Sequence, residues 1–95
     1  MIECNLTVQN RLGLHARPAS LFVQVTTKFK SKVRVCKESM EVDGKSIMGL
    51  LMLAAPMGTS LKITAEGEDE AALIEQLKKL FAAKFGESTD YQFTT

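Results

Sequence analysis

The stretch Gly13-Leu14-His15-Ala16-Arg17-Pro18-Ala19 marks the point at which an extended chain turns into a helix. Apolar residues before it alternate with polar ones, which is the period of a half-buried strand: Ile2, Cys4, Leu6 and Val8. After it, one helical stripe holds Ala19, Phe22, Val23 and Thr26. Because proline has no N–H, Pro18 fits a helix only in its first turn. The helix is therefore predicted to begin close to His15.

The residues at this predicted helix start have a chemistry of their own. His15 is the only histidine of the chain, and Arg17 follows two residues later. The backbone N–H groups of Ala16 and Arg17 have no partner within such a helix, and a helix start favours an anion. Histidine is a good nucleophile near neutral pH. The pattern suggests a residue that receives and passes on a phosphoryl group. It also fits a histidine that only caps the helix beside a solvated arginine.

The middle of the chain predicts three more strands. Alternation of apolar and polar residues indicates strands over residues 32–36, 40–42 and 61–66. The pair Asp43-Gly44 is a turn signature, and a hairpin between the first two of these strands is expected.

Two further helices are predicted. Ser46 reads as the N-cap of a short helix over residues 47–53. The last helix has acidic residues 68–70 in its first turn and lysines toward its end, which match the helix dipole. Gly86 is the expected residue just past its C-terminus.

The element order is therefore strand, helix, strand, strand, helix, strand, helix. Strands with a single apolar face need a cover on one side only. We expect an α+β open-faced sandwich, with a four-stranded antiparallel sheet and three helices on one face. Residues 1–86 are expected to form one domain, and the polar residues 87–95 a flexible C-terminal tail.

Composition excludes several classes of function. The chain has 95 residues and a net charge of +1, which gives no general attraction to nucleic acid or to an anionic membrane. One histidine and two separated cysteines, Cys4 and Cys36, lack the spacing of a metal site, and no cofactor is expected. No secretion signal or membrane-inserting segment is recognised, so a cytoplasmic protein with reduced thiols is expected.

Two motifs resemble a known family. Residues 10–19 resemble the active-site signature of HPr, the bacterial histidine-containing phosphocarrier of the sugar phosphotransferase system. Residues 42–53 resemble the second signature of that family, which surrounds a regulatory serine. The resemblance covers about residues 1–86 and implies the same open-faced sandwich.

The resemblance also implies roles for individual residues. His15 would accept the phosphoryl group at Nδ1, with Arg17 and the backbone amide of Ala16 stabilising its charge. Ser46 would be a regulatory site for a serine kinase and phosphatase. A surface for docking partners would comprise Ser20, Ile47, Met48 and Leu51, while Leu50 and Leu53 would face the core.

The partners implied are enzyme I, which is the phosphoenolpyruvate-dependent first enzyme of the system, and the sugar-specific IIA components. The chain would act as a monomeric phosphocarrier and not as an enzyme in its own right. Two other functions stay open. One is a nitrogen-branch or purely regulatory relative that acts by binding, and the other is an RNA-binding α+β domain, which the few aromatic residues disfavour. An alternative for the structure is that the helix over residues 47–53 is wedged into the core.

Overall fold

The computed structural model describes residues 1–86 as four strands, three α-helices and a final 3-10 turn. In chain order these are β1 (Ile2–Thr7), α1 (Ala16–Thr26), β2 (Lys32–Lys37), β3 (Met40–Asp43), α2 (Ile47–Leu53), β4 (Ser60–Glu66), α3 (Glu70–Ala82) and η1 (Lys84–Gly86). The predicted element order is confirmed. The predicted C-terminal tail lies outside the described residues and stays a prediction.

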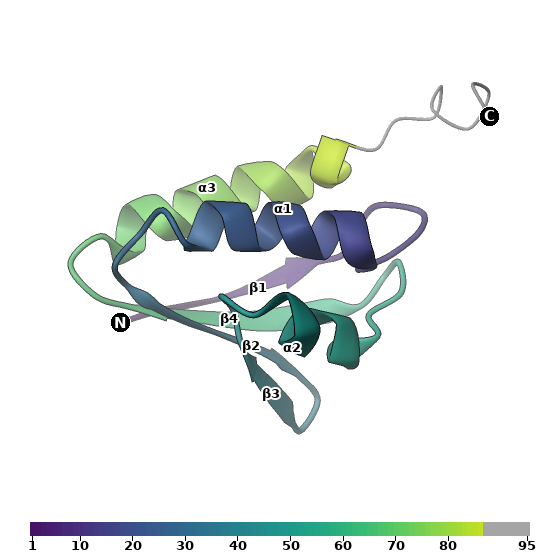
Figure 1. Cartoon of the computed structure of the whole chain (residues 1–95), viewed down its shortest axis with the longest axis horizontal. Helices are drawn as coiled ribbons and strands as arrows, with labels where there is room; N and C mark the ends of the chain where they lie inside the picture. Colours follow the sequence, from purple (N-terminus) through teal and green to yellow (C-terminus); the bar gives the residue numbers. More distant parts are fainter. Residues whose placement is uncertain (87–95) are drawn as a thin grey trace.

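The strands form one antiparallel sheet in the order β1-β4-β2-β3. Its central strand β4 alternates buried and accessible residues, so that Leu61, Ile63 and Ala65 point to one face. Ile63 lies opposite Cys4 of β1 and Val35 of β2, which places the apolar residues of neighbouring strands in register. Figure 1 shows the helices α1 and α3 running across this sheet, with α2 beside β3. The open-faced sandwich is therefore confirmed.

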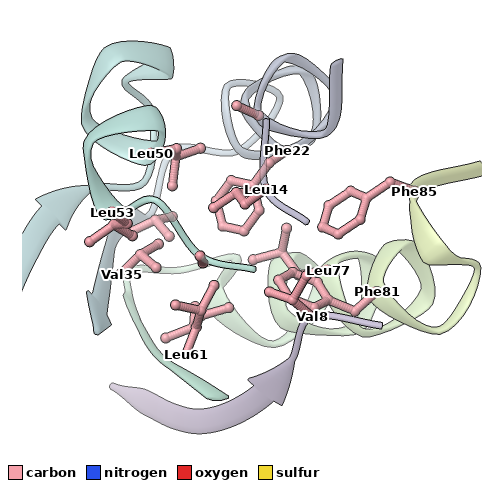
Figure 2. Close-up of a cluster of buried hydrophobic side chains, with 14 of the residues drawn as sticks. Val8, Leu14, Phe22, Val35, Leu50, Leu53, Leu61, Leu77, Phe81 and Phe85 are labelled. Atoms are coloured by element: carbon pink, nitrogen blue, oxygen red, sulfur yellow. The ribbon is translucent and has the colours of Figure 1, made fainter. Parts of the chain in front are cut away.

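A core of fully buried side chains lies between sheet and helices, and Figure 2 shows many of them. Phe22 of α1 meets Phe81 of α3 edge to face, with 6.1 Å between ring centroids. Phe81 in turn lies 4.9 Å from Phe85 of η1. Burial of one such side chain contributes about 1.5–3 kcal/mol to folding. The three rings therefore fix α1 and α3 against each other.

The predicted hairpin between β2 and β3 exists, but the predicted turn was wrong. The chain reverses at Glu38 and Ser39, and Glu38 adopts a left-handed φ of 56°. The pair Asp43-Gly44 instead leads the chain out of β3 toward α2. Gly44 donates its N–H to the carbonyl of Val33 over 2.7 Å, and a Cβ at Gly44 would lie 2.5 Å from the Val33 side chain. Close backbone approach therefore explains this glycine.

The predicted end of the last helix was also wrong. The helix α3 stops at Ala82, before Gly86, and Lys84 and Phe85 adopt left-handed φ angles of 54° and 55°. This reversal turns Phe85 into the core, where it is 2 % exposed. The burial of this ring, worth about 1.5–3 kcal/mol, offsets most of the backbone strain, which is about 1–2 kcal/mol for each of the two left-handed residues.

The two cysteines lie on opposite faces of the sheet. Cys4 belongs to the face that carries Ile63, whereas Cys36 lies opposite Lys62 on the other face. Both thiols are half-buried and free, so Cys4 is less buried than a core residue. Burial raises the pKa of the Cys4 thiol, and Lys78 partly opposes that effect. A disulfide between the two would require the sheet to break.

Candidate functional site

His15 occupies the N-cap of α1, with extended φ and ψ angles of −108° and −163°. Its side chain makes no capping hydrogen bond and is half-exposed. His15 therefore occupies the N-cap position without its imidazole accepting a hydrogen bond from the helix N–H groups. The ring is accessible to a partner at the point where the helix begins.

The backbone amides after His15 are free to bind an anion. The first helical bond runs from the Ala19 N–H to the carbonyl of His15 over 2.9 Å. Ala16 and Arg17 are both exposed, and within residues 1–86 neither backbone N–H has an acceptor. Pro18 is buried in the first turn, as predicted, where its missing N–H breaks no bond. Two unpaired amides thus follow the imidazole directly.

The guanidinium of Arg17 is likewise available. No ion pair or side-chain hydrogen bond engages it within the described chain, and the first turn of α1 contains no acidic residue. A phosphate bound near His15 would not have to compete with a carboxylate on this turn for the guanidinium. Arginine suits such a ligand because its planar fork can form two parallel hydrogen bonds.

The loop before His15 is anchored by the buried side chain of Leu14 and by the close approach of Gly13 to Ala55. Leu14 is 4 % exposed and belongs to the core, where Figure 2 shows its side chain. Its N–H donates to the carbonyl of Ala55 over 2.8 Å. Gly13 has a φ of +77°, and a Cβ there would lie 2.7 Å from the Ala55 carbonyl oxygen. Only glycine therefore allows this loop to lie so close to the segment after α2.

Ser46 occupies the N-cap of α2, as predicted, and its Oγ accepts a hydrogen bond from the Gly49 N–H over 3.0 Å. The side chain is half-exposed. The hydroxyl accepts the hydrogen bond and keeps its own proton, so capping and access to a modifying enzyme are compatible.

The helix α2 divides into a buried and an exposed side. Leu50 and Leu53 are buried at 0 % and 2 % exposure, which confirms that they face the core and excludes a helix wedged inside it. The exposed side forms what we call the α2 patch: Ile47, Met48, Leu51 and Met52, with Leu51 half-buried. Met52 is 66 % exposed and was not predicted as part of the docking surface, although it lies one helical turn after Met48. Ser20 is half-buried on α1, the helix that packs against α2.

Three long-range contacts hold α2 at its two ends. Thr26 Oγ1 donates to the carbonyl of Gly44 over 2.9 Å, and Lys45 Nζ donates to that of Phe29 over 2.8 Å. At the other end, Lys37 Nζ donates to the carbonyl of Leu53 over 3.0 Å. An ammonium group at the last carbonyls stabilises a helix C-terminus. Sequence reasoning missed both lysines, because their acceptors are far away in the chain.

The described residues contain neither a cluster of metal-ligating side chains nor a helix that could cross a membrane. Within residues 1–86, histidines, cysteines and carboxylates do not gather in groups of three that could hold an ion. None of the helices in this part of the chain has the length and apolar character needed to cross a bilayer.

Comparison with known proteins places this geometry in context. A family model described as the phosphorylation site of the HPr component of the phosphotransferase system matches residues 2–83. The phosphocarrier protein HPr of Xylella fastidiosa strain Temecula1 is 44% identical over 94% of this chain and 100% of its own length.

Solved structures agree with that match. The crystal structure of HPr-C-His from Thermoanaerobacter tengcongensis superposes with a TM-score of 0.89 and 45% identity, covering 93% of this chain and 99% of the other. A structure described as an HPr dimer from the same organism gives a TM-score of 0.74 at 46% identity, over 92% and 100% of the two chains. Among similar proteins, a monomer is thus not the only state observed in structures.

Proposed function

This chain belongs to the HPr family of phosphocarrier proteins of the phosphotransferase system, and from that premise we propose that His15 is its phosphoryl acceptor. In this proposal the neutral imidazole attacks the phosphorus of a donor through Nδ1. A nitrogen–phosphorus bond forms as the bond between phosphorus and the donor's leaving group breaks. The neutral ring carries its one proton on Nε2, which leaves the Nδ1 lone pair free to attack, and the ring holds the phosphoryl group until an acceptor takes it.

One exposed cation and two unpaired backbone amides, all within two residues of His15 in the chain, support the proposal. The phosphorylated ring gains negative charge, which the Arg17 guanidinium and the backbone N–H groups of Ala16 and Arg17 would neutralise by charge-assisted hydrogen bonds. Phosphoryl transfer depends mainly on positioning and charge stabilisation. A shallow surface site can therefore hold the group while the partner proteins supply the rest of the catalytic machinery.

The donor and acceptors in this proposal are enzyme I and the IIA components of the system. The α2 patch supports that role, since Met48 and Met52 are 70 % and 66 % exposed. Flexible methionine side chains on an exposed apolar surface suit binding to several partners. Ser20 lies on α1, the helix that begins directly after the acceptor. A phosphate on Ser46, at the edge of this patch, would regulate docking through its charge.

The single observation that carries the proposal is that the imidazole of His15 is accessible, makes no capping hydrogen bond and directly precedes two unpaired backbone amides. The test is incubation of the full chain with enzyme I and phosphoenolpyruvate, followed by intact mass measurement. We expect uptake of one acid-labile phosphate in the wild type and in Ser46→Ala, and none in His15→Ala. Uptake by the His15→Ala variant would refute the assignment.

A second step of the same experiment identifies the branch of the system. The phosphorylated protein is divided between a sugar-specific IIA component and a nitrogen-type IIA component, and the rate of phosphate loss to each is measured. We expect faster transfer to the sugar-specific acceptor. Transfer only to the nitrogen-type acceptor would assign the chain to the nitrogen branch instead.

A further inference from the structure

Asn10, five residues before His15, is the most buried polar group near the candidate site. The residue is 0 % exposed, and its side-chain Nδ2 donates to the carbonyl of Gly13 over 2.6 Å. The Gly13 N–H returns a bond to the Asn10 carbonyl over 3.2 Å. Side chain and backbone of Asn10 thus close one tight turn in the loop that leads to His15.

The Gly13 carbonyl oxygen is shared with His15. The backbone N–H of His15 donates to it over 3.1 Å, while the Asn10 amide donates to the same atom. A carbonyl oxygen has two lone pairs and can accept both bonds. The Asn10 side chain therefore fixes the peptide plane against which the His15 backbone is held.

This arrangement has an energetic cost that packing alone does not explain. Asn10 Oδ1 is buried and has no hydrogen-bond partner within the described residues. An unpaired buried oxygen destabilises the folded state, whereas an apolar residue of similar size would avoid that cost. Destabilising groups of this kind concentrate where a particular geometry is needed. Here the geometry that the amide enforces is that of the loop before His15.

We infer that Asn10 is a positioning residue for His15, holding the Gly13 carbonyl so that the imidazole is presented toward the amides of Ala16 and Arg17. The consequence for phosphate rests on the proposed function. Within a histidine ring Nδ1 is the nitrogen nearer the backbone, so a phosphate on it is sensitive to the direction of that backbone. Loss of the Asn10 amide would let the loop move and would weaken the hold of these amides on the phosphate.

The test compares Asn10→Ala and Asn10→Asp with Ser31→Ala, all in the full chain. Ser31 is a matched control because it is 1 % exposed and its hydroxyl also donates a hydrogen bond, a partly buried one to Asp69. It lies beyond the far end of α1, whose 11 residues span roughly 16 Å. All measurements are made where thermal denaturation shows every variant to be folded.

The first readout needs no phosphate. Hydrogen exchange of the His15 backbone N–H should be faster by at least about threefold in Asn10→Ala, and unchanged in Ser31→Ala. In Asn10→Asp the ionised carboxylate cannot donate to the Gly13 carbonyl, so protection should be lost at neutral pH. It should return as the pH falls, because the protonated carboxyl regains a donor. Equal exchange in all variants would overturn the inference.

The second readout uses the phosphorylated protein. Asn10→Ala should change the hydrolysis rate of the phosphate on His15. It should also lower kcat for phosphorylation by enzyme I by at least about threefold, with little change in the KM of enzyme I for this protein. A change confined to the melting temperature would show a merely structural role and would overturn the inference. If the wild type takes up no phosphate, the proposed function fails, while the exchange measurement still decides the role of Asn10.

Discussion

Thr26 Oγ1 donates a hydrogen bond to the carbonyl of Gly44 over 2.9 Å, and both residues are buried. The bond joins the last residue of the helix that begins after His15 to the turn that precedes Ser46. Replacement by Thr26→Val keeps the shape of the side chain and removes the donor. The Gly44 carbonyl then stays buried without this partner, and the free energy of unfolding should fall by about 1–3 kcal/mol.

Urea denaturation measures this effect, and Thr27→Val provides the control. Thr27 is exposed and its Oγ1 donates to the carbonyl of Val23 over 2.7 Å, so water can replace the lost bond. A change within about 0.5 kcal/mol is expected for the control. Equal losses in the two variants would mean that burial of the Thr26 bond adds nothing to its contribution.

A local signal in the sequence predicted the start of α1, whereas the two sides of α2 were assigned from the resemblance to a known family. Pro18 restricts a helix start to a few positions, because its missing N–H is harmless only in the first turn. For α2, the pattern indicated only that a helix on an open sheet buries one side, and the resemblance assigned Leu50 and Leu53 to that side. For the candidate site, local pattern was enough to bring His15, Ala16 and Arg17 together at one helix start.

Other features depend on contacts that no local pattern reveals. Glu38 and Phe85 adopt left-handed φ angles, which local preference assigns to glycine or asparagine. Phe85 does so because its ring is buried against Phe81, and that neighbour is known only from the fold. Lys37 and Lys45 are similar: each looks like a solvated charge until its carbonyl acceptor is brought beside it. The sequence pattern therefore locates the site but not the contacts that hold its elements in place.

Arg17 is predicted to stabilise the phosphorylated state through its bidentate donor geometry. Arg17→Ala should lower kcat/KM for phosphorylation by enzyme I by about ten- to a hundredfold, since it removes a charge-assisted contact of about 1.5–3 kcal/mol. Arg17→Lys keeps the charge without the planar fork and should recover part of the rate. Stopped-flow or quench-flow transfer assays measure both. Wild-type rates in Arg17→Ala would show that the guanidinium is a solvated charge.

Asp69 is predicted to make stability depend on pH in the acid range. Its carboxylate accepts hydrogen bonds from the Ser31 hydroxyl, the Lys30 N–H and the Ser31 N–H, and these bonds lower the pKa of Asp69 below its ordinary value. Because the unfolded chain then takes up the proton more readily, the stabilisation is complete above the unfolded pKa of about 3.9. It is lost as the pH falls through the lower pKa of the folded state.

Chemical denaturation from about pH 2 to about pH 6, a range that brackets the ordinary pKa of an aspartate, should show this loss in the wild type. Asp69→Asn should be less stable than the wild type at pH values where the wild-type carboxylate is ionised. Its free energy of unfolding should also vary less with pH across this range. Some slope should persist, because the Gly67 N–H and the terminal amino group also lower the pKa of Glu70. Parallel profiles for the two proteins would contradict the role of Asp69.

The α2 patch is predicted to act in docking and not in stability. Met48 is 70 % exposed, so Met48→Glu should change the free energy of unfolding by no more than about 0.5 kcal/mol. The same change should raise the KM of enzyme I for this protein by about tenfold or more, because it places a charge in an apolar interface. Met40→Glu is the control, since Met40 is 45 % exposed on β3 and outside the patch. Similar KM values for the two variants would remove the patch from the docking surface.

Ser46 is predicted to have separable effects on stability and on docking. Ser46→Ala removes the oxygen that caps Gly49, and the free energy of unfolding should fall by about 1 kcal/mol. Ser46→Asp keeps a capping oxygen and should stay within about 0.5 kcal/mol of the wild type. Only the aspartate variant places a negative charge beside Ile47 and Met48, so only it should raise KM for enzyme I. Urea denaturation and initial-rate assays on the same samples separate the two effects. If Ser46→Ala raised KM as much as Ser46→Asp, capping of α2 and not charge would control docking.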